Sequence, residues 1–373
     1  MSSLNNRTIP SIPRLAVLSL VAITLLSLPA AAQLFTVTRL VSDIDNVGSQ
    51  PTDPDLVNPW GIVASSSSPW WVSDNGTGKL TLYNGDGVKQ GLIVNVPQWD
   101  NSPGGNPSGQ IYNGTSDFKL PNNNPARFIV STEDGTIQGW NSGTMTTIVV
   151  NGWPNAVYKG LALGSANGAN YIYAANFRAG TVDVFDGMFQ PHSFGQSAFL
   201  DPNLPSGYAP FNVANINGKI IVSYALQDDD KEDDVPGIGH GYIDVYDSTG
   251  NLLQRLPHVY AANSPWAMVV APSGWNQLSG KLLVGEFGSG GIAAYDLANN
   301  LFVGVLQDDQ GLPISINGLW GLAFGNGSGS GPTTTLYFTA GAFDEAHGLL
   351  GTITLSNSNL GRTPNAHRSA TRK

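Results

Sequence analysis

The sequence predicts an all-β protein, a six-bladed β-propeller of four-stranded antiparallel blades that is closed by an N-terminal strand. A short apolar run opens six times on a small residue after an aromatic residue or a proline, at residues 58–61, 106–109, 157–160, 209–212, 264–267 and 318–321. The steps between these openings are 48 to 55 residues, a period typical of radial β-repeats. The composition agrees, because 45 Gly and 24 Pro beside 41% hydrophobic residues indicate a turn-rich β protein.

Each unit repeats the same order of short strands. Second strands are expected at residues 70–74, 127–130, 171–174, 220–223, 281–284 and 336–339. Third strands, several of which alternate polar and apolar residues, are expected at 80–83, 136–140, 181–185, 242–246, 292–295 and 349–353. Turn residues such as Asn84-Gly85 follow them.

A fourth strand can be assigned in five units, for example at residues 92–94 and 302–306, but not after Leu355 in the sixth. The N-terminal run 35–41 is left over and has the length of a strand. We therefore expect it to complete the sixth blade, which removes an open sheet edge that would invite aggregation.

The two ends of the chain differ from this repeat. Residues 1–32 have a basic start, an apolar stretch at 15–28 and three alanines at 30–32, which is typical of a secretory signal peptide and too short for a membrane span. The propeller is assigned to residues 33–355, and the polar segment 356–373 is expected to be disordered. The expected location is secreted or periplasmic.

The charge balance restricts the partners. Without the signal and the tail, 11 of the 17 basic residues and all 27 acidic residues remain. Nucleic acid is therefore excluded as a partner, and neutral or cationic ligands are favoured. The alternative is that the acidity only keeps an exported protein in solution. The chain has no cysteine, so its core must be stable without disulfides. We expect the protein to be a monomer.

The repeat resembles the NHL type of propeller. Its unit is matched by Pro59-Trp60-Gly61-Ile62, by residues 71–74 and by residues 82–85. Residues 53–61, 174–177, 208–212 and 338–341 are also similar to an uncharacterised family of secreted bacterial proteins, many of which end in a PEP-CTERM sorting tail. This chain has no Pro-Glu-Pro and no apolar C-terminal segment. The resemblance implies a fold and brings no activity with it.

Propeller geometry places a candidate site at the mouth of the central channel. The loop that opens each inner strand and the loop between the second and third strands lie at the same end of a blade. Carboxylates and amides in these loops suit a calcium ion, and the candidate ligands are Asn58, Asp74, Asn176, Glu286 and Asn317. The alternative is that Asn and Asp fill these loops because they tolerate turn geometry.

A second set of residues at this end would contact an organic ligand, which could be a small molecule, a glycan or a protein. Three tryptophans begin inner strands at equivalent positions and either stack on a ligand or pack between blades. With four polar residues, the candidate ligand-binding set is Trp60, Lys159, Arg178, Asn212, Asn263, Trp266 and Trp320.

The densest charge in the chain is the run 228–234, in the longest loop between a second and a third strand. It lacks the glycine and the glutamate of an EF-hand, so it is either solvated and mobile or neutralised by a cation.

His347 and Glu345 are the catalytic candidates if the protein is an enzyme, because a histidine beside a carboxylate can exchange protons near neutral pH. The alternative is a surface histidine in a turn.

Two function classes therefore remain open. The first is a secreted or periplasmic binding module that uses the acidic channel-mouth face. The second is a calcium-dependent hydrolase of the lactonase or esterase kind, in which the metal polarises an ester. The second rests on analogy with other six-bladed propellers. The sequence has no Gly-x-Ser-x-Gly motif and no paired zinc spacing among its five histidines.

Overall fold

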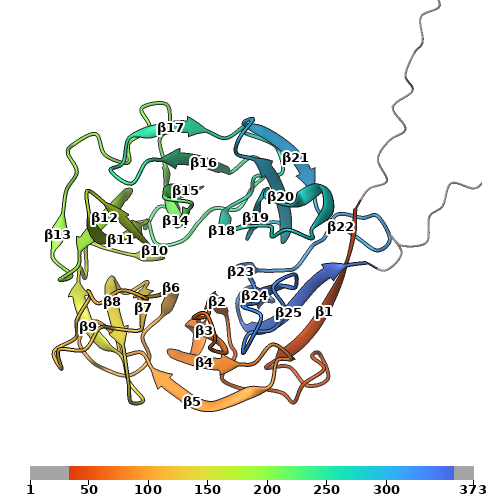
Figure 1. Cartoon of the computed structure of the whole chain (residues 1–373), viewed down its shortest axis with the longest axis horizontal. Coiled ribbons are helices and arrows are strands. Elements are labelled where there is room, and N and C mark those ends of the chain that lie inside the picture. The colour runs from red at the N-terminus through yellow and green to blue at the C-terminus, as the bar shows by residue number, and fades with distance from the viewer. Residues whose placement is uncertain (1–32, 357–373) are drawn as a thin grey trace, which may run out of the picture. The chain divides into compact units, whose positions relative to one another are not determined.

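The computed structural model describes residues 33–356, which form six blades around a central axis (Figure 1). The expectations for a signal peptide at 1–32 and for the tail beyond 356 lie outside the described residues. Five blades are four-stranded antiparallel sheets of consecutive strands, as expected. Within residues 33–356, no helix is long and apolar enough to span a membrane.

In each of these five sheets, the first strand in the chain is the innermost and the last is the outermost. Blade 1 consists of β2 (Pro59–Val63), β3 (Trp70–Asp74), β4 (Lys79–Tyr83) and β5 (Lys89–Asn95). Blade 2 consists of β6 (Pro107–Tyr112), β7 (Phe128–Thr132), β8 (Thr136–Trp140) and β9 (Thr147–Asn151). Blade 3 consists of β10 (Tyr158–Ala166), β11 (Ala169–Asn176), β12 (Thr181–Asp186) and β13 (Pro191–His192).

The next two blades repeat the pattern. Blade 4 consists of β14 (Tyr208–Ile216), β15 (Lys219–Leu226), β16 (Gly241–Tyr246) and β17 (Leu252–Arg255). Blade 5 consists of β18 (Pro265–Val270), β19 (Leu282–Glu286), β20 (Gly291–Asp296) and β21 (Leu301–Val305). The helical residues within the described part are two short 3-10 turns, η1 (Asn75–Thr77) and η2 (Asn276–Leu278).

The sixth blade joins the two ends of the described chain. It contains β23 (Leu319–Phe324), β24 (Leu336–Ala342), β25 (His347–Leu355) and β1 (Leu34–Ser42). β1 pairs antiparallel with β25, and the two-residue strand β22 (Gln307–Asp308) pairs parallel with the start of β1. The predicted closure by an N-terminal strand is confirmed. Phe35 of β1 is fully buried, and its ring centroid lies 4.9 Å from that of Trp275, so this contact helps to hold β1 in the blade.

The need for a small residue where an inner strand opens is steric. Inner strands of neighbouring blades converge on the axis, so their backbones lie close together. A Cβ atom on Gly109 would lie 2.6 Å from the Cα of Gly160, and one on Gly61 would lie 2.7 Å from the carbonyl oxygen of Ser108. Both distances are shorter than any side chain tolerates, so glycine is required at these positions.

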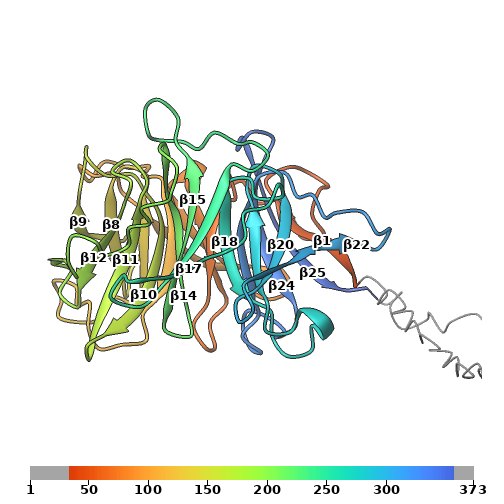
Figure 2. The same cartoon turned by 90° about the horizontal axis from the view of Figure 1, so that it is seen from above.

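The central channel has two unlike parts. From the small residues toward their C-terminal ends, the inner strands line a cavity of about 450 Å³. Its wall includes Gln110, Asn212 and Asn215 and carries no charged side chain. At the other end, where the inner strands begin, aromatic rings fill the axis. We call this end, with the loops around it, the channel mouth. The loop between β15 and β16 rises above its neighbours in the view along the blades (Figure 2).

Candidate functional site

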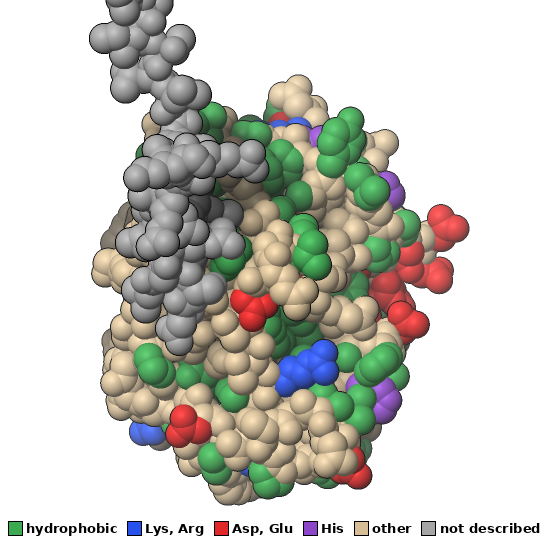
Figure 3. All heavy atoms as spheres, turned by 90° about the vertical axis from the view of Figure 1, so that its right-hand side faces the viewer, with side chains coloured by type: hydrophobic (Ala, Val, Ile, Leu, Met, Phe, Trp, Pro, Cys, Tyr) green, Lys and Arg blue, Asp and Glu red, His purple; other side chains and the backbone are tan. Residues whose placement is uncertain are grey.

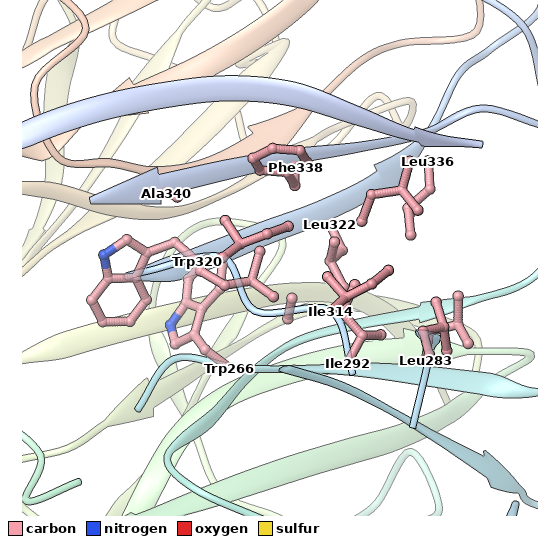
Figure 4. Close-up of a cluster of buried hydrophobic side chains, with 14 of the residues drawn as sticks. Trp266, Leu283, Ile292, Ile314, Trp320, Leu322, Leu336, Phe338 and Ala340 are labelled. Carbon is pink, nitrogen blue, oxygen red and sulfur yellow. The ribbon is translucent and has the colours of Figure 1, made fainter. Parts of the chain in front are cut away.

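Three tryptophans close the channel mouth from within. Trp60 and Trp320 stack at 3.5 Å between ring centroids, and Trp266 meets both rings edge-on at 5.9 and 5.6 Å. Figure 4 shows Trp266 and Trp320 at one end of the largest buried apolar cluster. All three are at most 4% exposed. Their rings pack against one another and against neighbouring blades, so they form the floor under the polar mouth.

A chain of amide hydrogen bonds rises from this floor. The Trp320 Nε1–H donates to Asn58 Oδ1 at 3.0 Å. The Asn58 Nδ2 in turn donates to Glu345 Oε2 at 2.5 Å and to Asn75 Oδ1 at 3.3 Å. Asn58 has a φ of 47°, a left-handed conformation that asparagine tolerates better than most residues. The opening loop of blade 1 thereby connects the aromatic floor to the loop between β24 and β25.

The same network continues to a buried lysine. Asn75 Nδ2 donates to Glu133 Oε2 at 2.6 Å, and the other carboxylate oxygen of Glu133 accepts from Lys159 Nζ. Lys159 also bonds Asp233 Oδ1 at 3.1 Å and lies 5.1 Å above the Trp60 ring. Burial lowers the pKa of Lys159, but the Glu133 and Asp233 carboxylates outweigh it and hold that pKa above the usual 10.5. Lys159 is therefore a fixed positive charge under the mouth.

Two carboxyl groups beside Lys159 titrate near neutral pH. Burial raises the pKa of Glu345 to about 7, against the opposing effect of the hydrogen bond from Asn58. Burial likewise raises the pKa of Asp234 to about 6, although Lys159 favours its charged form. Protons can therefore be gained or lost at the mouth within the physiological range.

Two carboxylates of the acidic run 228–234 pair with cations elsewhere in the protein. Glu232 pairs with Arg178, and Asp233 pairs with Lys159. Arg178 also donates to the carbonyl oxygen of Pro154 at 2.9 Å. Asp229 and Asp230 of the same run are exposed, as a solvated loop predicts. Acidic side chains project from one side of the molecule in Figure 3.

A cavity of about 370 Å³ adjoins the network on the blade 2 and blade 3 side. Glu133 and Asp233 belong both to the network and to the cavity wall. The indole rings of Trp99 and Trp153 stack in this wall at 4.0 Å between centroids, with 7° between their planes. The mouth is therefore continuous with a hollow that a small ligand can enter.

The five candidate calcium ligands have separate partners. Asp74 is fully buried and accepts from Thr81 Oγ1 at 2.6 Å. Asn176 donates to Asp183 at 2.9 Å, and Asn317 accepts from the backbone N–H of Phe343 at 2.7 Å. Asn58 belongs to the network above. Within residues 33–356, no group of three or more His, Asp or Glu side chains is placed to hold a metal ion.

Glu286, the fifth candidate, is enclosed in blade 5. Its Oε2 accepts from the backbone N–H of Asn263 at 2.8 Å, and its Oε1 has no hydrogen-bond partner among the described residues. A calcium ion shared by the five residues would require these contacts to be exchanged, so the donor set does not fit one ion in this arrangement.

The burial of Glu286 predicts a pH dependence of stability. Desolvation raises the pKa of this carboxyl from 4.5 to about 8. The native state therefore retains a proton that the unfolded chain has lost, and stability falls as pH rises from about 4.5 to 8. The slope from one such group is about 1.4 kcal/mol per pH unit. Urea unfolding at pH 5, 6, 7 and 8 should show a smaller decline for Glu286→Gln than for the wild type. Equal slopes would contradict this role of Glu286.

The catalytic candidates His347 and Glu345 have different partners. His347 Nδ1 pairs with Asp43 Oδ2 at 2.8 Å, and its ring meets Phe343 edge-on. Glu345 bonds Asn58 at the mouth. The two side chains are thus held by different parts of blade 6 and its neighbour.

The remaining ligand candidates are held by the backbone. Asn212 Nδ2 donates to the carbonyl oxygen of Trp266 at 2.7 Å, which links blade 4 to blade 5. Asn263 Oδ1 accepts from the backbone N–H of Gly237 at 2.6 Å and anchors the long acidic loop. Of the ligand-binding set, Lys159 and Arg178 therefore have the closest connection to the acidic groups of the mouth.

Several residues that make the site are not among the candidate ligands and catalytic residues that the sequence predicts. Asn75, Glu133, Asp233 and Asp234 lie in loops that were assigned to the mouth, so their loop position was a usable signal. Trp99 and Trp153 lie in the connections that precede blades 2 and 3, and nothing in the repeat marks them.

The comparisons give a fold and a family. No protein-family model matches the chain. Its fold is similar to the structure of streptogramin B lyase (TM-score 0.50, 12% identity, 86% of this chain and 97% of the other). It is also similar to a soluble aldose sugar dehydrogenase from Escherichia coli (TM-score 0.54, 12% identity, 86% and 100%). At such low identity these likenesses concern the fold alone.

Two curated relatives come from Acanthamoeba polyphaga mimivirus. The uncharacterized protein R648 is 31% identical over 345 residues, which cover 87% of this chain and 81% of the relative. The uncharacterized protein L690 is 30% identical over 342 residues, which cover 87% and 86%. The chain belongs to the same family of six-bladed propeller proteins as these two viral proteins.

Proposed function

We propose that the protein is a secreted or periplasmic binding module whose ligand site is the acidic channel mouth. The observation that carries this proposal is the connected network from Trp320 through Asn58 and Glu133 to Lys159. It holds polar groups from several blades in fixed positions around the end of the channel. Such a rigid arrangement lowers the cost of ordering the site when a ligand binds.

The charge of the mouth favours a cationic ligand. The carboxyl groups of Glu133, Asp233, Asp234 and Glu345 surround the single ammonium group of Lys159. Asp233 keeps 76% of its side chain exposed and can meet a ligand directly. A surface with excess negative charge attracts cations and speeds their association.

A thermal-shift screen of the purified full chain tests this role. Argininamide and spermidine should raise the melting temperature by several degrees, whereas citrate and glucose should not. A ligand at a hundred times its dissociation constant stabilises by about 2.7 kcal/mol. The proposal fails if no cationic probe raises the melting temperature.

We also propose calcium binding, which requires the candidate ligands to exchange their present contacts, and the same screen tests it. The expected result is a higher melting temperature in calcium chloride than in a chelator. Equal melting temperatures in the two conditions reject calcium binding.

A calcium-dependent lactonase or esterase-like hydrolase is the second candidate, favoured by the pKa of about 7 at Glu345. A carboxyl group with this pKa can act as a general acid or base near neutral pH. With its ester bound at the mouth, Glu345 would take a proton from the attacking water, and the pH–rate profile would show a rising limb near 7.

A panel of esters and lactones, assayed with Glu345→Gln and His347→Ala, separates these roles. If the chain is a hydrolase that uses Glu345, its replacement should remove turnover. His347→Ala should change turnover by less than about threefold, because His347 pairs with Asp43 instead. It should also change stability by no more than about 0.5–1 kcal/mol, as expected for a partly exposed pair. Turnover that depends on His347 and survives Glu345→Gln would reverse this assignment.

A further inference from the structure

The cavity beside the channel mouth has an aromatic wall, and a general role in binding cations does not explain it. It measures about 370 Å³, within the range of small-ligand sites. Trp99 and Trp153 lie stacked in its wall, and Trp153 is 47% exposed. The buried tryptophans of the channel floor fill the core, whereas this pair leaves a large aromatic surface in contact with solvent.

The backbone holds this aromatic wall in place. The backbone N–H of Trp99 donates to Asp134 Oδ2 at 2.7 Å, and its carbonyl oxygen accepts from Asn151 Nδ2 at 2.9 Å. Trp99 is therefore fixed between the loop after β7 and the end of β9. The Trp153 ring stacks on the Trp99 ring, so the two indoles support each other in the wall.

Carboxylates surround the same cavity. Glu133, Asp134, Glu232 and Asp233 line it together with the guanidinium of Arg178, and the buried Lys159 pairs with Glu133 and Asp233, so the acidic groups remain in excess. Arg178 is already paired with Glu232 and with the Pro154 carbonyl oxygen. A guanidinium group in contact with a carboxylate is therefore already part of the cavity wall.

We propose that this cavity binds a planar organic cation, a guanidinium or amidinium group, stacked on the Trp99–Trp153 pair and paired with the surrounding carboxylates. A guanidinium is planar and weakly hydrated, stacks on aromatic faces and offers parallel N–H donors to carboxylates. An ammonium group is compact and strongly hydrated, and it uses the flat wall less well. The inference rests on the proposed binding role and names the ligand chemistry of that site.

Three probes with the same phenyl ring separate charge from shape. Benzamidinium is planar and charged, benzamide is planar and neutral, and benzylammonium is charged but not planar at its cation. Titration calorimetry of the full chain should show that benzamidinium binds at least tenfold more tightly than benzamide and severalfold more tightly than benzylammonium. A blocked Gly-Arg-Gly peptide is the fourth arm, and its binding would identify a peptide side chain as a source of the cation.

Substitutions in the wall locate the binding. Trp153→Ala should weaken benzamidinium at least tenfold, because the exposed half of the wall is lost. Tyr260→Ala, at another highly exposed aromatic residue, should change it less than twofold. Unfolding curves show whether Trp153→Ala is folded, and Trp153→Phe, which retains a ring, should bind with an intermediate affinity.

The outcomes distinguish this inference from the broader role. Benzamidinium that binds no better than benzamide, or equally well to Trp153→Ala, overturns the planar-cation site. If argininamide still stabilises that folded variant as it does the wild type, the binding role of the acidic mouth stands without the aromatic wall. If no cationic probe binds the wild type, both proposals fail.

Discussion

A chain that begins at Asp43 should fail to fold cooperatively, whereas one that begins at Gln33 should fold. Removal of residues 33–42 deletes β1 and exposes the edge of β25 along its whole ladder. It also removes Phe35 and Val41, both almost fully buried. Each of these side chains contributes about 1.5–3 kcal/mol through burial alone. With the lost ladder, the cost approaches a total stability of about 5–15 kcal/mol.

Urea unfolding followed by circular dichroism, with light scattering for aggregation, measures this effect. The shortened chain should show no cooperative transition and should aggregate through the open edge. A cooperative transition with the midpoint of the longer chain would show that the ring does not depend on β1.

The second large effect is expected for Trp320→Ala, which should destabilise the protein by about 3–5 kcal/mol. Trp320 stacks on Trp60 and, at 3.9 Å between centroids, on Phe287. Its removal leaves a cavity at the channel floor and takes the donor away from Asn58 Oδ1. Chemical denaturation gives the change in free energy of unfolding.

The control for this substitution is Trp153→Ala, the same change at an exposed tryptophan. It should cost about 1 kcal/mol or less, because less apolar surface is lost and water can fill the space. If the two variants lost the same free energy of unfolding, the buried aromatic floor would contribute no more to stability than an exposed tryptophan, and it would not support the mouth.

The fold could be predicted because its signals are local and repeated. A spacing near fifty residues, turn residues after the third strands and one surplus strand at 35–41 led to the closed ring. β-Propeller geometry predicted that the opening loops and the loops between second and third strands share one end, and Asn58, Lys159 and Glu345 meet there in one network.

The partners within the mouth could not be predicted, because they depend on how distant loops fold over one another. Lys159 of blade 3 meets Glu133 of blade 2 and Asp233 of blade 4, which are 26 and 74 residues away in the sequence. Loop conformation, which no repeat specifies, decides which of many acidic residues reaches it.

The separation of Glu345 from His347 has a similar cause. Two residues apart in a regular strand, their side chains would point to the same side. Residues 343, 344 and 345 instead have φ values of 55°, 51° and 63°. This left-handed turn redirects the chain before β25 begins at His347, so the two side chains reach different partners.

The most direct test of the acidic mouth as a ligand site compares two charge-matched variants by titration calorimetry with argininamide. Glu232→Gln/Asp233→Asn removes two charges at the cavity, and Asp229→Asn/Asp230→Asn removes two charges from the same loop at exposed positions that do not line it. At physiological salt, charges more than about 8 Å from a ligand are largely screened. The first variant should therefore bind at least tenfold more weakly than the wild type, and the second less than twofold more weakly. Equal weakening in both variants would show that the acidity acts only as a general surface property, and unchanged binding in the first would place the ligand elsewhere.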